Sequence, residues 1–175
     1  MNDHVPAHAA PAHTALNHNV GLLIGLVVVA VIIRRQLRTR PVRPRASLIG
    51  PAVLGVLGVA ALAFGVASAV KEHPLTAPTV ALVVATLALG VPLGLVRATT
   101  VRVWHDPDRG VLRKGTLITT ALWLVSAAVH AGMAQWIDHT AAAGLLGFST
   151  LYLYLCVTYG VQGHAVRRRA SRLPT

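Results

Sequence analysis

The chain alternates long apolar blocks with short segments that hold almost all of its basic residues. Only 12% of its 175 residues are charged, 54% are hydrophobic, and the mean hydropathy is +0.62. Soluble domains carry about 25% charged residues, so half that fraction, gathered between apolar blocks, indicates an integral membrane protein. The length leaves room for one helical unit and for no separate soluble domain.

Five apolar blocks predict five transmembrane helices, and therefore an all-α polytopic bundle. The predicted spans are residues 16–34, 47–70, 76–96, 115–137 and 140–162. The first block is short for a hydrocarbon core of about 30 Å, and it spans only if residues 15–19 extend the helix and Arg34 and Arg35 snorkel. Residues 20–165 form the transmembrane domain, residues 1–19 an outer tail and residues 166–175 a basic cytoplasmic tail.

The basic residues fix the predicted orientation of these spans. Of the 16 Lys and Arg residues, 15 fall on one side of the five-span arrangement and only Lys71 on the other. Cytoplasmic loops carry the excess of Lys and Arg, so the N-terminus is expected outside and the C-terminus inside a bacterial cytoplasmic membrane. The net charge of +11 is accounted for by this topology, and no nucleic-acid partner is predicted.

The longest polar passage lies between the third and fourth spans, at residues 97–115. A sequence of turn-forming residues, DPDRG, separates two short stretches that read as strands. We expect a small β-hairpin-like loop at the cytoplasmic interface. The residues expected to contact lipid or a partner are Arg102, Trp104, Arg113 and Lys114 here, with Arg34, Arg35 and Arg38 in the earlier basic segment.

The predicted spans contain few polar groups, and no Asp, Glu, Lys or Arg is expected inside any of them. A proton-coupled transporter is therefore disfavoured. His130 is the one histidine well inside a span, and it is the candidate ligand for a haem iron or a quinone. A histidine hydrogen-bonded between packed helices is the alternative. On the fifth span, Tyr152 and Tyr159 are expected to share a face from which Tyr154 points away.

The histidines of the outer tail and the single cysteine are weak candidates for metal or thiol chemistry. The outer tail carries His4, His8, His13 and His18, but it has no cysteine and only Asp3 as a carboxylate. Its prolines argue against a continuous helix, so we expect a disordered tail and no metal site. Cys156 is the only cysteine in the chain, which excludes an intrachain disulfide.

The order of these features resembles the CcdC-like family, which consists of small bacterial integral-membrane proteins of unknown function. The likeness covers residues 20–161. It includes the Arg-Gln-Leu-Arg element at residues 35–38 and is sharpest at residues 90–116, where a Gly-rich helix end leads into the loop. The resemblance implies a link to cytochrome c maturation and no agreed activity. The lone Cys156 departs from a thiol-redox role.

These observations favour a non-catalytic accessory or assembly subunit that binds membrane lipids and either a membrane-protein partner or a second copy of itself. No cofactor is assigned in this interpretation. The first alternative is a redox protein that binds haem or a quinone through His130, with two copies supplying two haem ligands. A small-molecule transporter is a weaker alternative.

Overall fold

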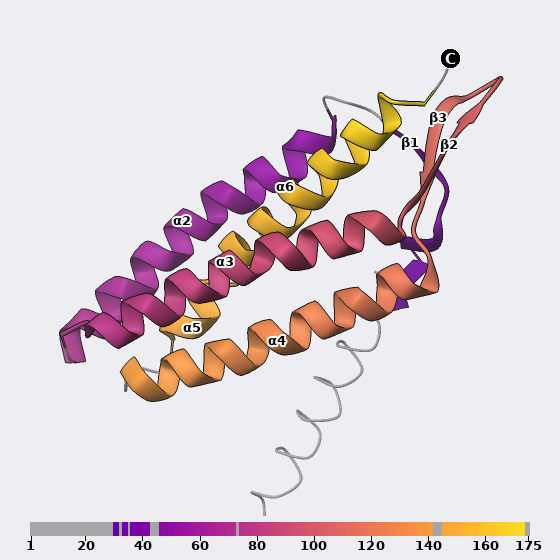
Figure 1. Cartoon of the computed structure of the whole chain (residues 1–175). Coiled ribbons are helices and arrows are strands. Elements are labelled where there is room, and N and C mark those ends of the chain that lie inside the picture. Colours follow the sequence, from indigo (N-terminus) through magenta and orange to yellow (C-terminus); the bar gives the residue numbers. More distant parts are fainter. Residues whose placement is uncertain are drawn as a thin grey trace, which may run out of the picture.

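The computed structural model describes residues 30–31, 33–34, 36–42, 46–72, 74–141 and 145–173. Within them lie three long helices, α2 (Ala46–Glu72), α3 (Ala77–Thr100) and α4 (Leu117–Ala141). A one-turn helix, α5 (Leu146–Ser149), precedes α6 (Leu151–Ala170), which lies along α2 and α3 (Figure 1). The predicted mainly helical fold is confirmed. Arg35, nearly all of the first predicted span and the outer tail with its four histidines lie outside the described residues.

Three helices of the described part are long and apolar enough to cross a membrane. The candidate spans are Leu48–Lys71, Ala77–Thr100 and Leu117–Thr140, each of 24 residues. At 1.5 Å per residue each measures about 36 Å, which exceeds a hydrocarbon core of about 30 Å. Large apolar side chains such as Val56, Phe64 and Trp136 are exposed on them. These features are consistent with the predicted membrane class.

Helix α6 packs against both α2 and α3, and glycines allow the close approach. A Cβ atom added to Gly94 of α3 would lie 2.8 Å from the backbone oxygen of Thr158 on α6. One added to Gly58 of α2 would lie 2.6 Å from the backbone nitrogen of Leu153. Small residues at these positions let the backbones approach without side chains between them. The core of the bundle is therefore formed around α6.

The predicted fifth span is wrong in its boundaries. It was expected at residues 140–162, after a turn at Asp138 and His139, but α4 continues through both residues to Ala141. The Oδ1 atom of Asp138 accepts a 2.6 Å hydrogen bond from the backbone N–H of Gly147 and so satisfies the start of α5. A new helix then begins at Leu151 and runs to Ala170, past the expected end. Asp138 and His139, which were taken for a turn, are therefore residues of α4, and Asp138 also binds the start of the next helix.

The predicted end of the third span at residue 96 is also wrong. Helix α3 continues to Thr100, so Arg97 lies inside it and inside a candidate span. This overturns the expectation that no charged residue falls within a span. The Nη1 atom of Arg169, on α6, donates hydrogen bonds to the backbone oxygens of Ala98 (2.7 Å) and Val101 (3.1 Å). These bonds satisfy carbonyls that a helix end leaves open, and they allow the extra turn.

A small antiparallel sheet joins α3 to α4. Strand β2 (Arg102–Asp106) pairs with β3 (Gly110–Lys114), and the Oδ1 atom of Asp106 accepts hydrogen bonds from the backbone N–H groups of Asp108 and Arg109 in the turn. Gly110 follows with a φ of +72°, a conformation that favours glycine. The sequence did not indicate the third strand, β1 (Arg40–Pro41), which pairs with the other edge of β3. This third strand stabilises the hairpin of β2 and β3, since two strands alone are only marginally stable.

Candidate functional site

Large polar side chains fill the space between α4, α6 and the end of α3. Trp123, Ser126 and His130 are spaced three and four residues apart, so they share one face of α4. Tyr154 and Tyr159 approach them from α6. We call the following residues the interior cluster: Arg97, Trp123, Ser126, His130, Tyr154 and Tyr159.

Tyr154 is the buried residue that connects His130 to Ser126. Its hydroxyl donates a 3.0 Å hydrogen bond to the backbone oxygen of Ser126 and lies 2.6 Å from the Oγ atom of the same residue. Its ring stacks on the imidazole of His130, with centroids 4.7 Å apart and planes 22° apart. The hydroxyl is thus engaged with Ser126, while the ring face covers one side of the histidine.

His130 is buried, with 4% of its surface exposed, and neither ring nitrogen has a hydrogen-bond partner among the described residues. A neutral imidazole carries one donor and one acceptor. Leaving such a buried group unpaired costs on the order of 1–3 kcal/mol. The structure therefore shows no partner for the imidazole within the described part of the chain, and the alternative of a histidine hydrogen-bonded between packed helices stays a prediction.

Arg97 is the most deeply buried cation of the described part, with 1% of its surface exposed. Its Cζ atom lies 5.1 Å from the centroid of the Tyr159 ring, and the hydroxyl of Tyr159 accepts a 2.8 Å hydrogen bond from the indole N–H of Trp123. Nε and Nη2 of Arg97 have no hydrogen-bond partner among the described residues. The site therefore holds a buried cation, two of whose nitrogens lack a partner within the described part of the chain.

The surroundings do not balance this charge. A cation over an aromatic ring is stabilised by about 2 kcal/mol when desolvated, whereas removing the ion from water costs several kcal/mol. Among the described carboxylates, Asp106 and Asp108 lie at the tip of the sheet. Asp138 lies on α4 about 22 Å along the helix from Trp123, at 1.5 Å per residue. None of these three carboxylates therefore pairs with Arg97 in the structure.

The expected arrangement of the tyrosines is wrong. Tyr154 and Tyr159 both reach α4, while Tyr152, the expected companion of Tyr159, is 41% exposed. Arg97 was assigned to a polar loop. The spacing of Gly90, Gly94 and Arg97, four and three residues apart, was the available sign that all three lie on the face of α3 toward α6.

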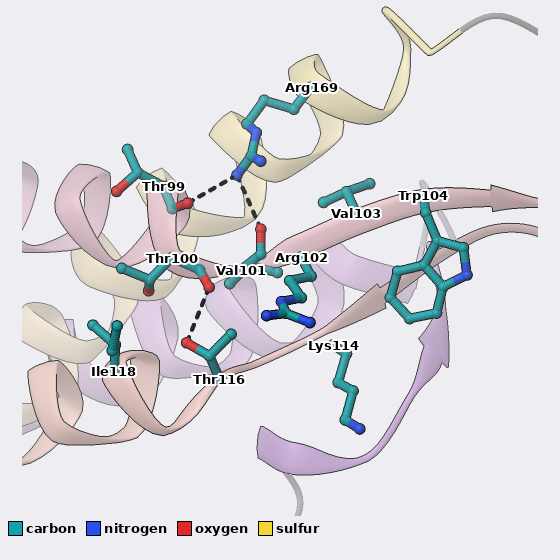
Figure 2. Close-up of a pocket in the computed structure, with 10 residues that line it drawn as sticks. All are labelled: Thr99, Thr100, Val101, Arg102, Val103, Trp104, Lys114, Thr116, Ile118 and Arg169. Atoms are coloured by element: carbon teal, nitrogen blue, oxygen red, sulfur yellow. Dashed lines mark hydrogen bonds between the residues drawn. The ribbon is translucent and has the colours of Figure 1, made fainter.

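The residues predicted to contact lipid or a partner are only partly brought together. Arg102, Trp104 and Lys114 line one groove at the end of the bundle (Figure 2). Arg113 alternates to the other face of β3, opposite Arg40 of β1. Burial, and then the neighbouring charge of Arg40, lower the pKa of Arg113. Arg34 and Arg38 are exposed and do not line this groove.

No protein-family model, curated protein or solved structure matches this chain. Within the described residues, no group of three or more His, Cys, Asp or Glu side chains is placed to hold a metal ion. The four tail histidines lie outside those residues.

Proposed function

We propose that the chain is a membrane-embedded binding protein for a small ligand with hydrogen-bond acceptor oxygens. The observation that carries this proposal is His130, which is buried against Tyr154 while neither ring nitrogen has a partner among the residues that the structure describes. Arg97 supports it from α3, because its guanidinium is buried and two of its nitrogens have no partner in the same part of the chain. A ligand between these residues would offset the cost of both groups.

A quinone is the ligand class that best matches these groups. Arg97 and Trp123 both contact Tyr159, so they lie at a similar level of the bundle. Trp123 and His130 are seven residues apart, which places Arg97 and His130 about 10 Å apart along the axis of α4. A quinone carries a carbonyl oxygen at each end of a flat ring, which one N–H of a neutral His130 and the guanidinium of Arg97 would recognise. Tyr154 and Tyr159 offer aromatic faces for stacking, and the apolar tail of a quinone is soluble in the bilayer.

The wider setting of this site extends the prediction from the sequence. We place it in a five-span protein of the bacterial cytoplasmic membrane, with the N-terminus outside and the C-terminus inside. The support is the one-sided distribution of Lys and Arg. Binding of a ligand without catalysis would be compatible with the role of an accessory or assembly subunit. The resemblance to the CcdC-like family makes cytochrome c maturation the process to examine first.

The test is a titration of the detergent-purified protein with a short-chain quinone, in which quenching of tryptophan fluorescence measures binding. We expect His130→Ala and Arg97→Gln each to raise the Kd about tenfold or more, since a lost hydrogen bond to a charged or buried group contributes about 1.5 kcal/mol. His139→Ala is the matched control, because it removes an exposed histidine from the other end of α4.

Equal affinities for the wild type and the His130→Ala variant would refute the quinone site. An absorption spectrum of the same sample distinguishes the haem alternative. A Soret band that disappears in His130→Ala would assign His130 to haem iron instead. A colourless protein that binds no quinone and purifies with a stoichiometric companion would leave the accessory role without an internal ligand.

A further inference from the structure

A second site lies at the end of the bundle, separate from the interior cluster. A groove of about 760 Å³ opens between the last turn of α3, strand β2, the start of α4 and the side chain of Arg169 (Figure 2). Its cationic lining residues are Arg102, Lys114 and Arg169. None of the ten lining residues, all within the described part of the chain, is acidic.

Two of these cations are placed where they repel each other. Arg102 of β2 and Lys114 of β3 are directly opposite in the register of the sheet, and both are exposed. Like charges in opposed positions destabilise a strand pair. An anion bound between them would turn this repulsion into two attractive contacts.

The third cation is held in position by the protein. The Nη1 atom of Arg169 donates hydrogen bonds to Ala98 and Val101 at the end of α3, which fixes the guanidinium at the wall of the groove. Thr116, at the start of α4, also lines the groove, and its Oγ1 atom accepts a 3.2 Å hydrogen bond from the backbone N–H of Thr119. The positive end of the α4 dipole therefore adds to the three side-chain charges.

The groove also lies at the depth of lipid headgroups. One candidate span ends at Thr100 and the next begins at Leu117, and the groove lies between these two ends. Leu117 and Ile118 begin the apolar surface of α4, with 74% and 63% of their surfaces exposed. Trp104, on β2, is the residue type that is enriched at the membrane–water interface. Cations and tryptophan on one side and apolar side chains on the other match a lipid better than a free anion.

We propose that this groove binds the phosphodiester headgroup of an anionic phospholipid, with the acyl chains lying along the exposed start of α4. The phosphate oxygens meet Arg102, Lys114 and Arg169, and the acyl chains meet Leu117 and Ile118. The proposal does not depend on a ligand in the interior cluster, and the variants that test it leave Arg97 and His130 unchanged.

The experiment is native mass spectrometry of the full chain in detergent, titrated with phosphatidylglycerol or with phosphatidylcholine of the same acyl chains. We expect the wild type to retain phosphatidylglycerol about tenfold better than phosphatidylcholine. The double variant Arg102→Gln/Lys114→Gln removes both positive charges, keeps polar side chains at both positions and should lose that preference. Arg109→Gln/Lys71→Gln is the control, since it removes two positive charges, one from the exposed turn of the sheet and one from the other end of α2.

A preference that survives in Arg102→Gln/Lys114→Gln, or that falls equally in the control, would overturn the proposal. A second arm adds millimolar inorganic phosphate, which should not displace the lipid; complete displacement would identify a soluble phosphate as the ligand. Quenching of Trp104 fluorescence by brominated phosphatidylglycerol, compared with Trp104→Phe, reports occupancy in intact vesicles. A copurifying protein that crosslinks at Arg102 and excludes lipid would also contradict it.

Discussion

At the residue scale, the proposed ligand site depends on polar side chains that are buried without a complete set of hydrogen-bond partners. Tyr154 is engaged with Ser126, whereas His130 and Arg97 each have nitrogens without a partner among the residues that the structure describes. Buried groups of this kind lower the stability of the ligand-free protein, and a ligand that pairs with them would restore that stability. In the proposed site, Tyr154 is the fixed part that positions the histidine, and His130 and Arg97 are the two groups with which a ligand would pair.

Arg97→Met tests this division directly. Replacing an uncompensated buried charge with an apolar side chain of similar length should raise the free energy of unfolding of the ligand-free protein by about 1–4 kcal/mol. The same change should abolish ligand-induced stabilisation. Thermal unfolding with and without quinone measures both effects. A variant that is less stable than the wild type without ligand would show that Arg97 is already compensated.

The sequence permitted the prediction of His130 as the interior candidate, because it is the one histidine well within an apolar block. Arg97 was missed for a physical reason. The apolar run ends at Val96, and the helix is extended by Arg169, which is 71 residues away from its acceptor Ala98 in the chain. A long-range contact of this kind leaves no local pattern in the sequence.

At the element scale, α6 is the helix on which the others depend. Gly58 of α2 and Gly94 of α3 admit its backbone, and its tyrosines reach across to α4. The long apolar blocks made α2, α3 and α4 predictable. The end of α4 was not predictable, because Asp138 followed by His139 is also typical of a turn, and the contact of Asp138 with Gly147 is visible only in the folded structure.

Gly94→Ala should disrupt this packing. The added Cβ would lie 2.8 Å from the backbone oxygen of Thr158, so the helices must separate, at a cost on the order of 1–3 kcal/mol. Gly132→Ala is the matched control on α4, since a Cβ there meets nothing within 4 Å, and higher helix propensity should leave stability unchanged or raise it by up to about 1 kcal/mol. Denaturant unfolding of both variants compares the two sites, and equal effects would argue against close α3–α6 packing.

At the scale of the whole molecule, the bundle has two chemically different ends. The sheet, the groove and the basic end of α6 lie together at one end, and the short connection from α2 to α3 lies at the other (Figure 1). The one-sided distribution of basic residues predicts that the first end faces the cytoplasm. The count of basic residues was available from the sequence, whereas the position of Arg102, Lys114 and Arg169 around one groove required the folded structure.

Cysteine accessibility in whole cells tests that orientation. In a Cys156→Ser background, Pro74→Cys should react with a membrane-impermeant maleimide added outside the cell. Arg109→Cys should react only after the cells are opened, because the turn of the sheet is exposed on the cytoplasmic side. Reversed labelling of the two positions would invert the topology and move the lipid groove to the outer leaflet.

The position of α6 in the chain has a consequence for synthesis. Helices α2, α3 and α4 leave the ribosome first, and each of them waits for contacts that only α6 supplies: Leu153 for Gly58, Thr158 for Gly94, and Tyr154 for Ser126. Arg169, near the end of α6, must also arrive before the last turn of α3 is capped. We therefore expect nascent chains to stay open to quality-control proteases until α6 is made and packs against them, and chains that stop before α6 to be degraded rather than accumulate.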